Sequence, residues 1–332
     1  MKSIFIMLLL LVVISQSSAQ SAEKVTPAFG LSDKETTLQR GKAKYEMYCS
    51  GCHGLKGDGQ GPAANFLDPK PRNFVEAQYK FTSGVSGTLP TDADLMRVIT
   101  DGLHGTSMPS WKLVSEVDRH AIVSYIKTFA GDRFASEAST SSPTVIAEDP
   151  FLQSGSKEEA IARGEKAYHG LAACYSCHAA YIAPDKINEA RVSYQMDAQS
   201  EYRAHLGEPV ATQTESGQTI LPPDFTWNQI KSGSDLTNLY RIIANGINGT
   251  AMPSWKGVLA EEDLWGMAYY VNSLAEKRPK IVTEAALTER KLKLADFESQ
   301  RIAFEEQMKL EASKKAAEAA QKTEAVVESV TP

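Results

Sequence analysis

The spacing of apolar and polar residues along the chain predicts short helices joined by loops. Thr91, Ser115 and Ser156 stand where helix N-caps are expected, while residues 54–91 hold many of the glycines and prolines and read as loop. No stretch alternates apolar and polar residues for long enough to require a sheet. The pattern therefore predicts an all-α fold. Its expected helices are 36–48, 92–101, 116–129, 160–172, 235–245 and 261–274.

The N-terminal pattern differs from the rest of the chain. Lys2 precedes an apolar run from Ile4 to Ile14, and Ser17-Ser18-Ala19 supplies small residues at the −3 and −1 positions of a cleavage site. The run is too short to span a membrane, so it indicates a signal peptide over residues 1–19, with a retained anchor as the alternative. No later segment approaches a transmembrane span. We therefore expect an exported, periplasmic mature chain.

The C-terminal pattern predicts one more helix, in a charged tail at 281–332. Residues 283–327 are rich in Ala, Glu and Lys, with acid-before-base pairs at i,i+4 such as Glu289/Lys293 and Glu311/Lys315. The apolar seam is short and is interrupted by Arg301, so the sequence favours a solvated single helix over a docking helix. We expect fraying beyond Ala312.

The chain contains an internal repeat. Cys-x-x-Cys-His occurs at 49–53 and again at 174–178, and it uses all four cysteines. Downstream, residues 95–111 align without gaps on 239–255, with ten of seventeen positions identical and Gly-Thr-x-Met-Pro-Ser-Trp in both. Arg-Gly pairs at 40–41 and 163–164 open both halves. This order of segments, present twice, indicates a duplicated domain.

Composition narrows the class of protein. A length of 332 residues with 42% hydrophobic and 23% charged residues fits two globular domains. The formal charge of −6 argues against a nucleic-acid binder, and four cysteines are too few for a disulfide-built scaffold. Removal of residues 1–19 would make the charge −7, which suggests a basic patch on at least one partner.

The chemistry lies in the Cys-x-x-Cys-His runs. Two thiols three positions apart can add to the two vinyl groups of haem, and the adjacent imidazole can then reach the iron. Zinc would need four ligands per site, a thioredoxin-like pair would need a βαβ setting, and a disulfide would not explain the histidines. The sequence therefore favours covalent haem on Cys49, Cys52, Cys174 and Cys177. The proximal histidines would then be His53 and His178.

Each iron then needs a sixth ligand or an open face. Met108 and Met252 occupy the same position in the repeated loops, so we expect them to be axial ligands, with core packing as the alternative. His/Met ligation raises the reduction potential. Trp111, Trp255, Arg97 and Arg241 also repeat, and each can be read as a haem-crevice residue or as an ordinary packing or surface residue. His104 is matched by Asn248, so we interpret it as a solvated loop residue.

Residues 36–130 resemble a class I cytochrome c domain, and 156–277 resemble a second one after a linker at 131–155. The resemblance rests on the run from Gly57 to Ala64, on Pro69 to Phe74, and on the Met-Pro-Ser-Trp loops. It implies two tandem helical bundles around two covalently attached haem c groups, plus the C-terminal helix. The second half lacks the Gly-Asp-Gly-x-Gly-Pro run and has nineteen extra residues between His178 and Met252. We expect these to form a longer haem-covering loop.

Three functional hypotheses follow. The first is a dihaem carrier of single electrons between periplasmic donor and acceptor proteins of a respiratory chain, with no catalytic residues. The second is a dihaem enzyme of the peroxidase or thiosulfate dehydrogenase type, with one non-Met or open iron. The third is an assembly module, held on a larger respiratory complex through the C-terminal helix. The paired Met loops favour the first hypothesis, and the third is compatible with it.

Overall fold

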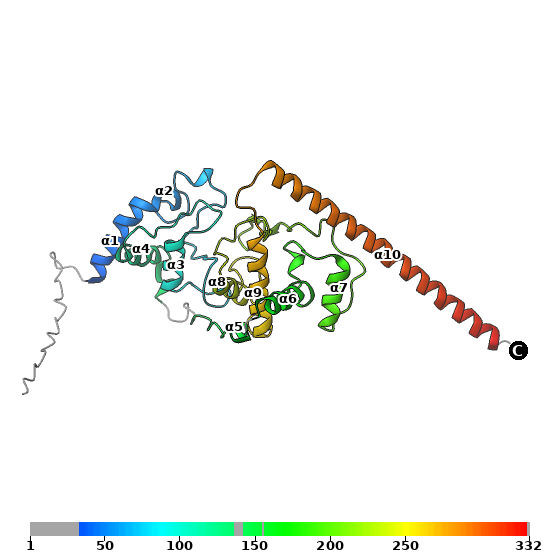
Figure 1. Ribbon diagram of the computed structural model, residues 1–332. Helices are drawn as coiled ribbons and strands as arrows, with labels where there is room; N and C mark the ends of the chain where they lie inside the picture. Colours follow the sequence, from blue (N-terminus) through cyan, green and yellow to red (C-terminus); the bar gives the residue numbers. More distant parts are fainter. Residues whose placement is uncertain (1–32, 136–141, 155, 331–332) are drawn as a thin grey trace, which may run out of the picture.

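The computed structural model describes residues 33–135, 142–154 and 156–330, and it shows two helical halves and a long C-terminal helix (Figure 1). The expected signal peptide at 1–19 lies outside the described residues, as does 136–141 of the expected linker. Within the described ranges, no helix combines the length and apolar character needed to cross a bilayer. The predicted all-α class is confirmed.

The first half contains four α-helices and two short 3-10 turns. The α-helices are α1 (Asp33–Tyr48), α2 (Ser50–His53), α3 (Asp92–Asp101) and α4 (Glu116–Thr128), and the 3-10 turns are η1 (Ala64–Phe66) and η2 (Gly131–Phe134). Thr91 and Asp94 form a reciprocal capping box at α3, and the Ser115 hydroxyl accepts a hydrogen bond from the amide of Asp118 at α4. These caps confirm the predicted helix starts.

The second half repeats this arrangement with additions. Its elements are α5 (Pro150–Ser154), α6 (Lys157–Lys166), η3 (Ala167–Leu171), η4 (Cys174–Ser176), α7 (Pro184–Ser193), α8 (Leu236–Asn245) and α9 (Glu261–Glu276). The expected longer loop contains α7 and a two-stranded antiparallel ladder, β1 (Thr212–Gln213) with β2 (Thr219–Ile220). The half also extends back into the expected linker, because Phe151 of α5 is buried against Tyr269 of α9.

The same helix crossing builds both halves. A Cβ atom on Gly41 of α1 would lie 2.1 Å from the carbonyl oxygen of Ala121 in α4, and one on Gly164 of α6 would lie 1.9 Å from that of Gly266 in α9. The preceding arginines bridge the same pairs of helices, Arg40 to Asp118 at 2.7 Å and Arg163 to Asp263 at 2.8 Å. The repeated Arg-Gly pair thus fixes a close helix contact and an ion pair beside it.

The two halves meet through reciprocal contacts. The amide of His104 donates to the carbonyl of Lys231 at 3.0 Å, and the amide of Asn248 donates to the carbonyl of Lys80 at 3.2 Å. His104 and Asn248 are equivalent in the repeat, and Lys80 and Lys231 each lie six residues after a matched phenylalanine. Each half therefore presents the same loop to the same segment of the other half, so the interface has approximate two-fold symmetry.

α10 (Glu284–Val330) is a single helix that follows the second half and then extends past α7 (Figure 1). The sequence favoured a solvated helix, and the structure differs over the first part of α10. Phe297 and Phe304 pack against the core of the second half, and Arg301 is only 9% exposed. Residues 312–321 are exposed throughout, and the helix continues through the region where fraying was expected.

Candidate functional site

Both Cys-x-x-Cys-His runs form one tight helical turn after the first cysteine. The amides of Cys52 and His53 donate to the carbonyl of Cys49 at 3.2 and 2.9 Å, and those of Cys177 and His178 donate to the carbonyl of Cys174 at 3.2 and 2.8 Å. All four thiols are free and half-buried. Burial raises the pKa of Cys49 and of Cys174 to about 12, so neither has the lowered pKa of a redox-active thiolate.

Each site histidine is held in one orientation. Nδ1 of His53 lies 3.0 Å from the carbonyl oxygen of Arg72, and Nδ1 of His178 lies 3.0 Å from that of Pro223. A carbonyl can only accept, so Nδ1 carries the proton and Nε2 keeps a lone pair for a metal. Phe74 and Phe225 stack on the two rings, with centroids 4.5 and 4.7 Å apart. Burial lowers the pKa of both histidines, which keeps them neutral.

The first Cys-x-x-Cys-His turn is covered by main chain from the glycine-rich run. The amide of Gly61 donates to the carbonyl of Cys52, and the amide of Ala63 donates to that of Gly51. A Cβ on Gly61 would lie 2.5 Å from the carbonyl oxygen of Gly51, so only glycine permits this approach. The glycine-rich run is therefore part of the first site.

Arg203 takes the place of that run in the second site. Its guanidinium donates to the carbonyls of Tyr175 at 3.0 Å, His178 at 2.9 Å and Glu208 at 2.6 Å. The amide of Val210 adds a hydrogen bond to the carbonyl of Cys177. Sequence reasoning missed Arg203 because it lies in an unmatched segment, although the absent glycine-rich run showed that another residue had to cover this turn.

The two Met loops are built alike. In each, the threonine hydroxyl two residues before the methionine accepts from the methionine amide, Thr106 from Met108 at 3.1 Å and Thr250 from Met252 at 3.2 Å. A Cβ on Gly102 or Gly246 would lie 2.6 Å from main-chain atoms of the loop, at positions with φ of 72° and 73°. The repeated glycines and threonines therefore fix the same loop shape around Met108 and Met252.

The other repeated residues divide between packing and the interface. Trp111 and Trp255 pack against the two cores. Arg97 and Arg241 line a hollow between the halves and bind Asp94 and Asn238 on their own helices. The side chain of His104 is exposed, as expected.

A cavity of about 130 Å³ between the halves carries polar groups suited to an anionic ligand. Arg72, Tyr79 and Lys80 line it on one side, and Asn248 and one carboxylate, Glu215, line it on the other. The Tyr79 hydroxyl is buried with no hydrogen-bond partner, and burial beside Arg72 and Lys231 lowers the pKa of Lys80 to about 8. Within the described residues Arg72 forms no ion pair. Free thiols, oriented imidazoles and a cationic rim fit haem, which carries two carboxylates.

These features define a c-type cytochrome, which holds haem c covalently and transfers electrons through it. The family described as "Cytochrome C oxidase, cbb3-type, subunit III" matches residues 36–126 and 159–271. The chain belongs to this family.

One solved structure extends the likeness across both halves. A chain of the Kuenenia stuttgartiensis reducing HAO-like protein complex Kustc0457/Kustc0458 is 30% identical, with a TM-score of 0.55. The match covers 71% of this chain and 96% of that one. Comparison with curated proteins found no significant match.

Proposed function

We propose that this chain is a dihaem cytochrome c that passes single electrons between protein partners, as a carrier or as a subunit of a respiratory complex. The observation that carries the proposal is the duplication of the whole site. Both halves present a half-buried Cys pair, a histidine whose Nδ1 donates to a carbonyl, and a methionine in a loop of the same shape.

In this proposal Cys49, Cys52, Cys174 and Cys177 hold two haem c groups. His53 and Met108 are the axial ligands of one iron, and His178 and Met252 are those of the other. The bound haem supplies a reversible Fe(III)/Fe(II) couple. The chain's own residues keep the imidazoles neutral and oriented, and a thioether ligand favours Fe(II).

The interface supports electron transfer between the halves. The contacts of His104 and Asn248 lie four residues before Met108 and Met252, so both Met loops border the same interface. The cationic groups Arg72 and Lys80 are at this border as well. We propose that haem carboxylates neutralise them and that electrons cross there.

Export and partners complete the proposal. The signal peptide would direct the chain to the periplasm and be cleaved after Ala19, and haem attachment and partner docking would take place there. The acidic charge favours partners with a basic docking patch. The structural neighbour belongs to a protein complex, which supports a role as a subunit.

Two measurements on the purified chain test this function. The intact mass should equal residues 20–332 plus two haems. The oxidised near-infrared spectrum should show the Met-to-iron(III) charge-transfer band at the intensity of two haems, and no high-spin signal.

Met108→Ala and Met252→Ala should each remove half of that band, while Met47→Ala, at a 66% exposed methionine, should leave it unchanged. A high-spin fraction in the unmutated protein would instead favour a dihaem enzyme with an open iron.

A further inference from the structure

The segment that orients His178 contains a buried carboxylate. Asp224 lies between Pro223, whose carbonyl accepts from His178, and Phe225, which stacks on its ring. Asp224 is 4% exposed. One of its carboxylate oxygens accepts from the amide and hydroxyl of Thr226 and from the hydroxyl of Tyr181, which in turn accepts from the amide of Phe225. The Asp224 carboxylate therefore holds in place the two residues that contact the His178 imidazole, Pro223 and Phe225.

A cation from α10 balances this carboxylate. Nη2 of Arg290 lies 3.2 Å from the second oxygen of Asp224, and the Arg290 guanidinium lies over the ring of Trp227 at 5.1 Å. Within the described residues this is the ion pair that Asp224 forms. The C-terminal helix thus supplies the counter-charge for a group beside the second site.

The first half provides an internal comparison. Asn73 occupies the position of Asp224, between Arg72 and Phe74, and its side-chain oxygen accepts from the amides of Val75 and Glu76. A neutral amide therefore holds the first turn without a counter-charge. Only the second site combines a buried carboxylate with an arginine from α10.

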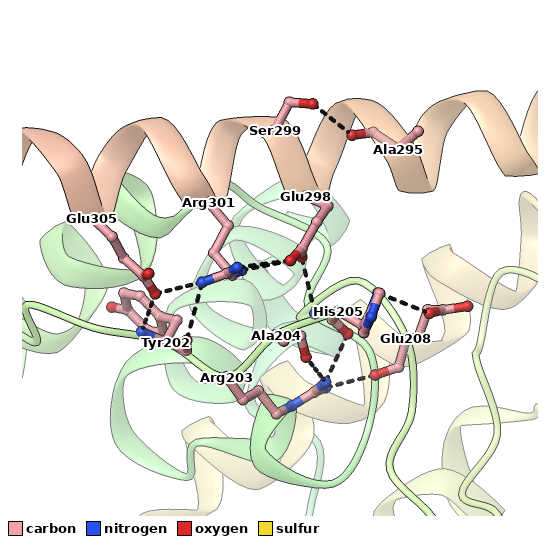
Figure 2. Close-up of polar contacts among 10 residues, drawn as sticks. All are labelled: Tyr202, Arg203, Ala204, His205, Glu208, Ala295, Glu298, Ser299, Arg301 and Glu305. Atoms are coloured by element: carbon pink, nitrogen blue, oxygen red, sulfur yellow. Dashed lines mark hydrogen bonds and ion pairs between the residues drawn. The ribbon is translucent and has the colours of Figure 1, made fainter.

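α10 also binds the loop that carries Arg203 (Figure 2). Glu305 accepts from the amide of Tyr202 at 3.1 Å, and Glu298 accepts from the amide of His205 at 2.9 Å. Arg301 lies between these two carboxylates and pairs with both. Arg203, inside the bound loop, points away from α10 to the carbonyls of Tyr175 and His178, so the loop links the helix to the second Cys-x-x-Cys-His turn.

We propose that α10 is a positioning element of the second haem site, in which Arg290 neutralises Asp224 and thereby sets the reduction potential of the haem bound at His178. This rests on the proposed function, since it requires a haem at His178. A buried carboxylate without its counter-ion stabilises Fe(III) relative to Fe(II), and a half-buried arginine without its carboxylate does the opposite. Arg290 and Asp224 therefore act on the potential in opposite directions.

The test is a redox titration of the holoprotein, in which two midpoint potentials are followed separately. Arg290→Gln should shift one potential downward and leave the other in place, and Asp224→Asn should shift the same potential upward. Arg290→Lys keeps the positive charge, so most of the downward shift seen in Arg290→Gln should be absent. The double variant Asp224→Asn/Arg290→Gln reproduces the neutral arrangement of Asn73, so it should return close to the unmutated value.

Lys291→Gln is the matched control, because it removes one positive charge from an exposed neighbour on the same helix. Equal shifts of both potentials, or a double variant that shifts as far as Arg290→Gln, would overturn the positioning role. If Arg290→Gln does not fold, the upward shift of Asp224→Asn and the value of the double variant decide the question. A haem-to-protein ratio of one in the unmutated protein would instead refute the dihaem function itself, and the positioning role with it.

Discussion

His169 shows how burial determines a protonation state in this chain. The side chain is fully buried, Nδ1 donates to the carbonyl of Glu165 at 2.9 Å, and Nε2 accepts from the amide of Tyr181 at 3.2 Å. Burial lowers its pKa to about 4, while the carbonyl contact opposes the shift. In the structure the neutral imidazole of His169 connects α6 to the segment after His178 through these two hydrogen bonds.

This depressed pKa predicts a loss of stability in acid. Above pH 6.5, the ordinary pKa of histidine, both the folded and the unfolded chain carry neutral His169. As the pH falls toward 4, only the unfolded chain gains the proton. The free energy of unfolding therefore decreases by about 3 kcal/mol. His169→Gln should flatten the fall in the free energy of unfolding between pH 6.5 and 4, measured by denaturant titration of the holoprotein.

The control for that prediction is His120→Gln. His120 is exposed beside Glu116, and the variant should show the same pH profile of the free energy of unfolding as the unmutated protein. An unchanged profile in His169→Gln would show that groups other than His169 cause the loss of stability in acid.

At the scale of residues, the sequence reveals what is contiguous. The thiols and histidine of each site stand within five positions, so their chemistry is readable without a structure. Asp224 and Arg290 lie 66 positions apart, and neither belongs to a motif. Their pairing depends on where α10 packs, which the local pattern does not specify.

At the scale of helices, the sequence predicts caps but not packing, because a cap depends on neighbouring residues and packing depends on distant ones. Thr91, Ser115 and Ser156 cap their helices as predicted, since each accepts from an amide three positions away. α7 escaped prediction, although Pro184 at its first turn is a helix-start signal. The docking of α10 was missed because its anchors include charged residues, and the sequence alone reads Arg301 as a break in an apolar seam.

The helix crossing of the second half predicts a large effect from one methyl group. Gly164→Ala would place a Cβ against the carbonyl of Gly266, so α6 and α9 would have to separate. This should lower the free energy of unfolding by about 1–3 kcal/mol despite the better helix propensity of alanine. Thermal and denaturant unfolding of the holoprotein measure it.

Lys166→Ala is the comparison variant for this effect. Lys166 is an exposed residue of the same helix, α6, so its change to alanine leaves the contact with α9 intact and should be close to neutral. A similar loss in both variants would mean that close packing of α6 on α9 is not the cause.

For the whole molecule, the reciprocal interface makes Asn248 a residue that joins the halves. Its side chain accepts from the amide of Gly87 at 2.8 Å and donates to the carbonyl of Thr88 at 2.9 Å. Asn248→Ala should cost about 1–2 kcal/mol and separate the unfolding transitions of the two halves in calorimetry. His104→Ala, at the equivalent exposed position, keeps its main-chain contact and should leave the transitions as they are.

The paired contacts His104 to Lys231 and Asn248 to Lys80 have the form of an isologous dimer contact, in which each surface patch meets its own copy. Duplication of the gene of such a homodimer, followed by fusion of the two copies, would produce this arrangement in one chain. Fusion makes such an association independent of concentration and releases the copies from the need to be identical. The two halves do differ: the first turn is covered by the glycine-rich run, and the second by Arg203 in a loop bound to α10.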